Sequence, residues 1–334
     1  MGAAIGQESG KTGKPEKSGN LRQAQVKNRR NWGNRGISNI GLAGFTDLTD
    51  FTGFTLLQAF YLCATMTNKP LILVTNDDGV FAPGIKALID VVRQYGEVVV
   101  VAPDSPQSGQ GHAVTLSKPI RYHEVKDFSD VKAYESTGTP VDCVKLAKNV
   151  ILQGRTIDLC VSGINHGSNA SINIIYSGTL SAAMEASVEG INSIGFSLLD
   201  YSFDADFTAA KLYADKIIRF VLAHGMTNGN LINVNIPALP GNAIRGIRVC
   251  RQAVGRWVEE FAEGTDPRGE KYYWLTGKFV VDDKGEDHDI WALENGYVSV
   301  VPSIHDLTNY GGLSHYAELM SIHEHADLKT LQHI

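Results

Sequence analysis

The residues of this chain with the clearest chemical potential are two adjacent carboxylates, Asp77 and Asp78, which follow the apolar run LILVT at residues 71–75. Successive side chains of a strand point to opposite faces, so neighbouring carboxylates converge only where the strand has ended and the chain turns. Gly79 permits such a turn. Two ionised carboxylates in a crevice repel each other, and a divalent cation between them resolves the conflict. The segment NDDG is also an ordinary turn sequence, which is the structural alternative.

Two further polar loops follow apolar runs that we expect to be strands. The first offers the Ser108 hydroxyl to a metal ion and the Gly109 backbone N–H to an anion. The second offers the amide oxygen of Asn165 as another ligand and Asn169 as a hydrogen-bond partner for a bound oxyanion. Carboxylate, amide and hydroxyl oxygens suit Mg²⁺ or Mn²⁺ rather than a structural zinc ion. A solvated loop and the side-chain capping of a long turn are the alternatives for these residues.

A third feature is the start of a strongly helical segment at Ser177, Gly178 and Thr179. The free N–H groups and the positive dipole end of a helix N-terminus bind phosphate, and two hydroxyl groups reinforce such a site. Glycine between the hydroxyl residues favours close approach of a ligand. A simple N-cap is the alternative interpretation.

The pattern of the surrounding chain predicts how these loops are brought together. From residue 69 to residue 237, short β-branched runs alternate with segments of helical periodicity, which predicts a doubly wound α/β domain with a mainly parallel sheet. Ligands of such sheets bind beyond the carboxyl ends of the strands, where all three loops would lie. The expected strands are 71–75, 97–103, 157–163, 193–199 and 231–237, and the expected helices are 83–96, 140–151, 179–190 and 207–225.

The two ends of the chain differ from this core, which we place at residues 66–240. Residues 1–65 have the composition of a disordered or non-native leader, and we expect Met66 to be the working start. Residues 241–334 are predicted to form a C-terminal extension that packs on the core, and either an oligomer interface or a solvated appendage is expected of such an extension. We expect it to be an antiparallel appendage rather than more of the sheet, with strands near 244–250, 271–277 and 296–303 and a terminal helix from about residue 314.

Composition narrows the class of protein. A chain of 334 residues with 43% hydrophobic residues can bury a core, and a formal net charge of −6 without a basic run argues against a nucleic-acid duplex as partner. The apolar stretch 51–65 is too short to span a bilayer, so no membrane partner is expected. Four widely spaced cysteines suggest reduced thiols in a cytoplasmic protein.

Taken together, the motifs resemble the SurE family of survival-protein phosphatases. The resemblance covers about residues 69–310 and rests on ILVTNDDGVFAPGI, VVVVAPDSPQSG, STGTPVDCV, VSGINHGSN and YSGTLSAAMEA, with DPRGEKYYWLTG and GYVSVVPSIHDLT in the last third. It implies a Rossmann-like core and a metal-dependent nucleotidase that hydrolyses nucleoside 5'- and 3'-monophosphates, and also short polyphosphate. It further implies one Mg²⁺ or Mn²⁺ per subunit and a homodimer or homotetramer assembled through the C-terminal extension.

The resemblance also assigns roles to single residues. The metal ligands of the family fall on Asp77, Asp78, Ser108 and Asn165, and its phosphate-binding positions fall on Gly109, Asn169, Ser177, Gly178 and Thr179. Asp77 and Asp78 are the expected catalytic residues. The expected reaction is attack of water on a phosphate monoester, with either aspartate as proton acceptor, and a covalent aspartyl-phosphate route is the competitor. A non-catalytic nucleotide-binding module and an interaction protein are the alternatives from other classes.

Overall fold

The structure is a computed structural model that describes residues 69–128, 131–202, 204–227 and 231–317. All of these residues belong to one compact unit, Ala64–Ile334. The expected leader at residues 1–65 and most of the expected terminal helix lie outside the described residues. Within the described ranges, every helix is too short or too polar to traverse a bilayer.

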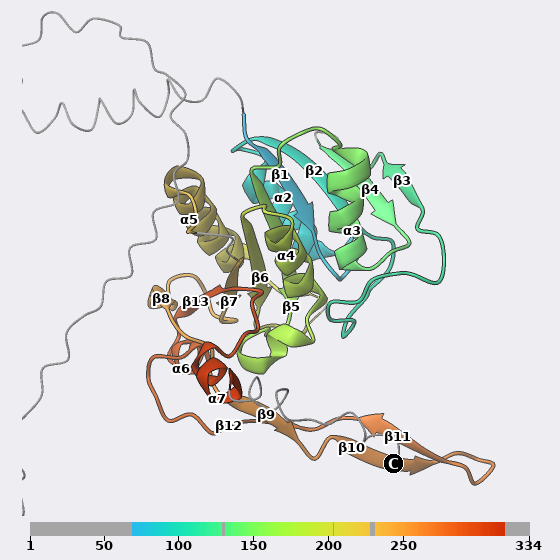
Figure 1. The fold of residues 1–334 in the computed structure, drawn as a ribbon, viewed down its shortest axis with the longest axis vertical. Coiled ribbons are helices and arrows are strands. Elements are labelled where there is room, and N and C mark those ends of the chain that lie inside the picture. The colour runs from blue at the N-terminus through green and yellow to red at the C-terminus, as the bar shows by residue number, and fades with distance from the viewer. Residues whose placement is uncertain (1–68, 129–130, 203, 228–230, 318–334) are drawn as a thin grey trace, which may run out of the picture. The chain divides into compact units, whose positions relative to one another are not determined.

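A nine-stranded sheet forms the centre of the fold, in the order β3-β4-β2-β1-β5-β6-β7-β13-β8 (Figure 1). The neighbouring strands from β4 to β7 are all parallel, which confirms the mainly parallel sheet expected from the continuous apolar runs. These strands are β1 (Leu71–Thr75), β2 (Glu97–Pro103), β4 (Lys132–Ser136), β5 (Leu159–His166), β6 (Ser193–Leu198) and β7 (Leu231–Ile236).

Helices cover both faces of the sheet, as the side chains of β1 show, because they point alternately to the two faces. Ile72 and Val74 pack in the cluster that includes the apolar residues of α2 and α5, whereas Leu71 and Leu73 pack in the cluster that includes those of α3 and α4. The fold is therefore doubly wound, as predicted. The helices are α2 (Pro83–Val92), α3 (Pro140–Leu146), which continues as the π-helix η1 (Ala147–Ile151), α4 (Gly178–Val188) and α5 (Thr208–His224).

The order of strands locates the ligand-binding edge. The chain continues from β1 to β2 on one side and later places β5 on the other side of β1. The loops after β1 and at the end of β5 therefore diverge around a crevice, which is the topological switch point where doubly wound sheets bind ligands. Asp77 and Asp78 follow β1, and Asn165 belongs to β5.

Sequence periodicity missed one hairpin at the sheet edge. β3 (Tyr122–Val125) pairs antiparallel with β4, and β4 pairs parallel with β2. Most residues of β3 are exposed, and its sequence YHEV lacks the apolar alternation of a half-buried strand. An edge strand of this kind carries little pattern from which to predict it.

The expected separate appendage after residue 240 is wrong for two of its strands. β13 (Val298–Ser303) pairs antiparallel with β7, and β8 (Ile247–Val249) pairs parallel with β13. Both strands therefore extend the main sheet. Val298 and Val300 belong to the same buried cluster as Ile72 and Val74 of β1. The sequence predicts strands at these places, but the period of a strand does not say with which strand it pairs.

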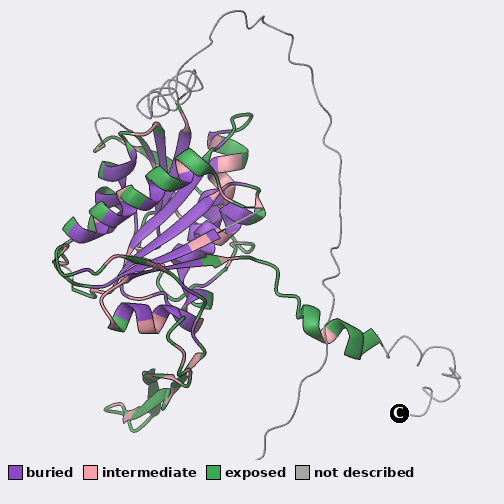
Figure 2. Cartoon of the chain, turned by 90° about the vertical axis from the view of Figure 1, so that its left-hand side faces the viewer, coloured by how far each residue is buried: buried purple, intermediate pink, exposed green. Residues whose placement is uncertain are grey.

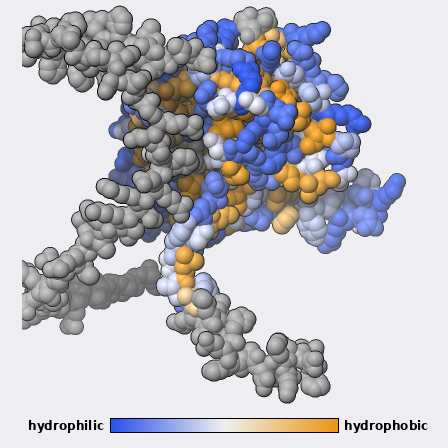
Figure 3. All heavy atoms as spheres, turned by 45° about the horizontal axis from the view of Figure 1, so that its top comes forward, coloured by the Kyte–Doolittle hydropathy of each residue, from blue (hydrophilic) through white to orange (hydrophobic). Residues whose placement is uncertain are grey.

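The remaining C-terminal strands form a hairpin that we call the arm, residues 255–281. Its strands pair antiparallel, β9 (Gly255–Val258) with β12 (Lys278–Val281) and β10 (Phe261–Thr265) with β11 (Lys271–Leu275). Figures 1 and 2 show the arm projecting from the sheet with mostly exposed residues. The short helices α6 (Asp289–Glu294), η3 (Tyr310–Gly312) and α7 (Leu313–Tyr316) flank β13. On the face drawn in Figure 3, hydrophilic side chains separate smaller apolar patches.

Candidate active site at the carboxyl edge of the sheet

Asn76 fixes the turn that carries the two aspartates. Its side-chain amide donates to the backbone oxygen of Gly79 (2.9 Å), and its side-chain oxygen accepts from the Gly79 N–H (3.2 Å). Gly79 has a φ of 101°, a conformation that side-chain-bearing residues rarely adopt. Asn76 and Gly79 therefore hold the turn, which leaves the Asp77 and Asp78 side chains available for other partners.

Asp77 faces the N-terminus of α4. Its carboxylate accepts a hydrogen bond from the Thr179 hydroxyl. A Cβ atom on Gly178 would lie 2.6 Å from the Cβ of Asp77, so only glycine allows this approach. Burial raises the pKa of Asp77, while the Thr179 hydroxyl and the N–H groups of Thr179 and Gly178 act against that shift. The helix N-terminus thus stabilises the charged form of a buried carboxylate.

Asp78 has weaker support, from a backbone hydrogen bond with His166. Its Oδ2 atom is buried and has no hydrogen-bond partner among the described residues. Burial, and then the charge of Asp77, raise the pKa of Asp78 to about 6, although His166 acts in the opposite direction. A buried carboxylate oxygen without a partner, next to a second carboxylate, is a position that a cation would stabilise.

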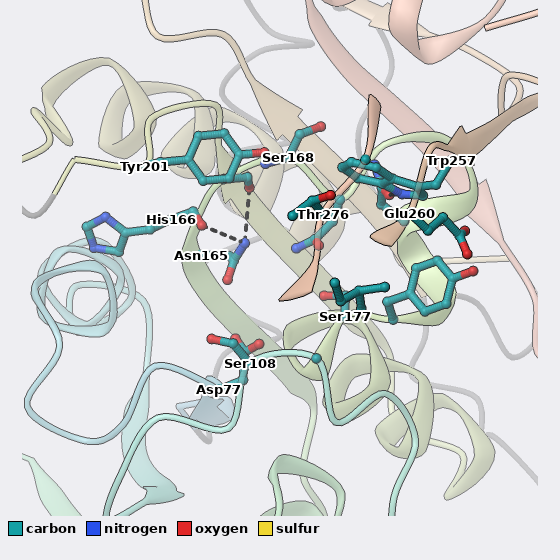
Figure 4. A pocket seen from close by; sticks show the side chains of 17 residues that line it. Asp77, Ser108, Asn165, His166, Ser168, Ser177, Tyr201, Trp257, Glu260 and Thr276 are labelled. Carbon is teal, nitrogen blue, oxygen red and sulfur yellow. Dashed lines mark hydrogen bonds between the residues drawn. The ribbon is translucent and has the colours of Figure 1, made fainter. Parts of the chain in front are cut away.

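Asn165 turns its amide oxygen toward Thr179, whose hydroxyl hydrogen-bonds Asp77. The Asn165 side-chain nitrogen donates to the backbone oxygens of His166 (3.3 Å) and Gly167 (3.0 Å), as the dashed lines in Figure 4 show. These bonds assign the nitrogen end of the amide, so the oxygen end is the one that lies 3.5 Å from the Thr179 hydroxyl oxygen. A register shift in β5 between Ser162 and Asn165 accompanies this placement.

The loop after β2 is held against the same site. The Gln107 N–H donates to the backbone oxygen of Asp77 (2.7 Å), and the Gly111 N–H donates to the backbone oxygen of Tyr176 (3.2 Å). His112 pairs with the buried carboxylate of Glu185 on α4 (2.8 Å). These contacts hold the loop on both sides of Ser108, and Ser108 lines the same cavity as Asp77.

The three loops and the arm enclose a cavity of about 730 Å³, a volume typical of small-molecule sites. In Figure 4, Asp77 and Ser108 lie at one end of the cavity, and Trp257 and Glu260 lie at the other. The residues that line it are Asp77, Ser108, Gly109, Asn165, His166, Gly167, Ser168, Asn169, Asn173, Tyr176, Ser177, Tyr201, Trp257, Glu260, Leu275, Thr276 and Gly277.

The family of the chain follows from a comparison with known proteins. Residues 72–259, more than half of the chain, match the family model described as Survival protein SurE. The chain belongs to the SurE family. The resemblance predicted from the motifs is therefore confirmed.

Individual relatives of this SurE-family protein agree with that result. It is 58% identical over 242 residues to "5'-nucleotidase SurE" of Christiangramia forsetii and 56% identical over 241 residues to that of Cytophaga hutchinsonii. Each alignment covers 72% of this chain and 93% of the relative. The crystal structure of the SurE protein from Aquifex aeolicus superposes with a TM-score of 0.67 at 40% identity, covering 75% of this chain and all of that one.

The site residues predicted for this SurE-family protein fall into two groups. Six of them line the cavity, whereas Asp78, Gly178 and Thr179 lie beside Asp77 and do not line it. The Thr179 hydroxyl is fully buried and is directed at Asp77. The six cavity residues are Asp77, Ser108, Gly109, Asn165, Asn169 and Ser177. The individual roles of all nine residues remain predictions.

Asn169 and Ser177 have structural partners as well. The Ser177 hydroxyl accepts from the Leu180 N–H (3.1 Å) and is therefore the N-cap of α4, as the capping alternative anticipated. The Asn169 amide donates to the Ser197 hydroxyl (2.8 Å), and its backbone N–H donates to the Asn235 side chain (2.8 Å). These bonds fix both side chains at the cavity wall, so a ligand would meet them already oriented.

The donor set fits a hard divalent cation. Asp77, Ser108 and Asn165 line the crevice, and the neighbouring Asp78 has a buried carboxylate oxygen without a partner among the described residues. In the described part of the chain, no group of three or more His, Cys, Asp or Glu residues could hold a metal ion. A zinc site built from such ligands is therefore not found there, and the oxygen-rich crevice matches the preferences of Mg²⁺ or Mn²⁺.

Sequence reasoning did not find the aromatic end of the cavity. Tyr176, Tyr201 and Trp257 line the cavity. Trp257 comes from the arm, which is far along the chain from the other loops. An isolated Trp in a charged strand-like segment carries no signal of a binding site. Tyr176 could have been noted, because it directly precedes Ser177 at the helix start.

Proposed function

We propose that this SurE-family protein is a 5'-nucleotidase, a phosphomonoesterase that converts nucleoside monophosphates to nucleoside and phosphate. The relatives described above carry that name at 56 to 58% identity. The observation that carries the proposal is the pair Asp77 and Asp78, with a buried carboxylate oxygen that has no partner among the described residues. Hydrolysis of 3'-monophosphates and short polyphosphate belongs to the same proposal, since the metal and phosphate ligands would be shared.

One divalent cation per subunit, Mg²⁺ or Mn²⁺, would be held by Asp77, Asp78, Ser108 and Asn165. When bound, such an ion neutralises phosphoryl charge and lowers the pKa of water. The negative charges of Asp77 and Asp78 would balance the positive charge of the ion. The hydrogen bonds that Asn165 donates to residues 166 and 167 orient its amide oxygen for metal binding. The Thr179 hydroxyl, which hydrogen-bonds Asp77, would keep that carboxylate in place.

The rest of the site would bind and orient the phosphate. The Gly109 N–H, the Ser177 hydroxyl and the Asn169 side chain lie at the cavity wall, where they can donate to non-bridging oxygens. Asp78 or Asp77 would accept the proton of the attacking water. Direct water attack is the favoured route, and formation of an aspartyl phosphate is the competing one.

A non-catalytic nucleotide-binding module is the second candidate. Its phosphate loops would resemble those described, but it would not need two adjacent carboxylates whose charge repels phosphate. Asp78 is costly to bury without a cation, as its raised pKa of about 6 indicates. This observation favours the enzyme.

We also propose that the protein is a cytoplasmic homodimer or homotetramer joined through the arm. A two-stranded hairpin is marginally stable alone, yet the arm exposes Phe261, Tyr273, Trp274 and Leu275, each more than half accessible. A second copy of the chain would cover these side chains. The described cysteines, Cys143, Cys160 and Cys250, are free and buried, which suits a reducing compartment.

The experiment that tests the function is a phosphate-release screen over nucleoside monophosphates and tripolyphosphate, with Mg²⁺, Mn²⁺ or chelator. We expect metal-dependent release from nucleotides that chelator abolishes without unfolding the protein. The variant Asp78→Asn should lose at least about a hundredfold in turnover, because a charged ligand is removed. Near-normal hydrolysis by this variant at saturating Mg²⁺ would contradict the proposed site. Solvent oxygen-18 appearing in Asp77 after a single turnover would replace water attack by the aspartyl-phosphate route.

A further inference from the structure

The end of the cavity opposite the aspartates is built differently from the phosphate end. Trp257, Glu260, Leu275 and Thr276 come from the arm, and Tyr176 comes from the turn just before Ser177. Figure 4 shows Trp257 and Glu260 on the side of the cavity away from Asp77 and Ser108. An apolar and aromatic wall at the end of the cavity opposite the phosphate donors suits a ligand with an uncharged, flat part.

The root of the arm is fixed to the rest of the site by a buried carboxylate. Asp289 is fully buried, and its two oxygens accept from the backbone N–H groups of Ser171 (2.7 Å) and Ala253 (2.9 Å). The Ser171 hydroxyl donates to the backbone oxygen of Ala253 (2.8 Å). The chain at Ala253, two residues before the arm, is therefore tied to the short helix η2 (Ser171–Ile175), which leads directly to Ser177.

Trp257 itself is held in a defined orientation. Its indole N–H donates to the side-chain oxygen of Asn173 on η2 (2.9 Å), and its ring lies edge-on against Phe279 with centroids 5.6 Å apart. The residue still has 39% of its surface exposed while it lines the cavity. Because the N–H is already bonded, the ring offers a fixed π surface and no further hydrogen-bond donor.

The charge of this end distinguishes between possible occupants. Glu260 brings a carboxylate to the same wall, and a phosphate chain extended along the cavity would carry its negative charge toward it. A nucleobase is uncharged and flat, and carboxylates accept hydrogen bonds from the amino groups of bases. The wall therefore suits the base of a nucleotide better than a second phosphate group.

We propose that Trp257 stacks against the base of the bound nucleotide and that the arm root forms the nucleoside subsite. The inference rests on the proposed nucleotidase function and adds the residue that separates nucleotides from other phosphate esters. Every base has a π surface, so stacking on Trp257 gives preference for a base without strong preference among bases. The substrate class is then nucleoside monophosphates in general, selected over phosphate esters without a base.

The test compares two substrates that differ only in the base, AMP and ribose 5-phosphate, at saturating Mg²⁺. In the variant Trp257→Leu we expect kcat/KM for AMP to fall about tenfold, mainly through KM, while ribose 5-phosphate changes less than twofold. Trp257→Phe should keep most of the AMP preference because it keeps a ring. Trp274→Leu is the matched control, since Trp274 also lies on the exposed arm but does not line the cavity.

The outcomes separate this inference from the proposed function. An unchanged ratio of AMP to ribose 5-phosphate hydrolysis in Trp257→Leu overturns the inference alone, and so does an equal loss in Trp274→Leu. If the unaltered protein hydrolyses neither substrate, the proposed function fails. In that case, calorimetric titration with adenosine still tests the nucleoside subsite. The inference then requires that adenosine binds about tenfold more weakly to Trp257→Leu than to the unaltered protein.

Discussion

The contact between Gly178 and Asp77 leads to a sharp prediction for the variant Gly178→Ala. The added Cβ would lie 2.6 Å from the Asp77 Cβ, whereas side-chain carbons do not approach below 3.0 Å. Either Asp77 or the first turn of α4 must therefore move by several tenths of an ångström. The Ser177 cap and the packing of α4 on the sheet hold the helix, so we expect most of the movement at the Asp77 side chain.

The size of the effect follows from the position of that side chain. A misplacement of about 1 Å in a catalytic group costs about a hundredfold in rate, so a shift of roughly half that distance should lower kcat/KM about tenfold. The apparent affinity for Mg²⁺ should fall with it, because Asp77 is a proposed ligand. Overpacking costs about 1–3 kcal/mol of stability, which is less than the free energy of unfolding of a typical domain. The variant should therefore fold.

The assay is phosphate release from AMP as a function of Mg²⁺ concentration, with circular dichroism and a thermal melt to verify folding. Gly241→Ala is the matched control, because its added Cβ meets only ordinary contacts, the nearest at 3.8 Å. It should behave as the unaltered protein. A folded Gly178→Ala variant with kcat/KM and Mg²⁺ dependence within twofold of the control would refute the reasoning that this close approach positions Asp77.

Three further predictions concern the ion, the loop and the arm. Because the pKa of Asp78 is raised to about 6, its protonated form stabilises the metal-free protein at low pH, and this stability is lost as the pH rises through about 6. The ion requires the charged form, so the increase in melting temperature at saturating Mg²⁺ should be larger near pH 7.5 than near pH 5. Equal increases at the two pH values in differential scanning fluorimetry would contradict this. The variant His112→Ala removes the ion pair that joins the Ser108 loop to Glu185. Because the His112 side chain is partly exposed, we expect only about a threefold loss of kcat/KM, corresponding to less than about 1 kcal/mol. His123→Ala on the exposed strand β3 is the control and should leave activity unchanged. Replacing Phe261 and Trp274 with lysine should shift the protein from oligomer to monomer in sedimentation velocity, and an unchanged sedimentation coefficient would remove the arm as the interface.

Much of the fold and part of the site were predictable because they depend on local pattern. Continuous apolar strands such as β1 and β5 are required by a sheet covered on both faces, and the turn residues after them mark the edge where ligands bind. The helix start at Ser177 carried its own signal, and its capping role is confirmed. The three loops predicted to meet do lie around one cavity.

The rest depends on contacts between residues far apart in the sequence. The pairing of β13 with β7 and the bond from Trp257 to Asn173 join segments that no local period relates. The partners of Asp77 and Asp78 also differ in a way that the sequence NDDG cannot reveal, because both residues read as equivalent carboxylates. Only the packing of Gly178 and Thr179 against Asp77 makes the distinction.

That inequality between the two aspartates has a consequence for how the protein can change. Asp77 contributes to the structure around the start of α4, so its replacement should weaken the scaffold as well as the chemistry. Asp78 has a buried oxygen without a partner among the described residues, so an uncharged substitute there could yield a sturdier but inactive protein. Random mutagenesis selected for heat resistance alone would then tend to erase Asp78 and retain Asp77, whereas selection for turnover would retain both.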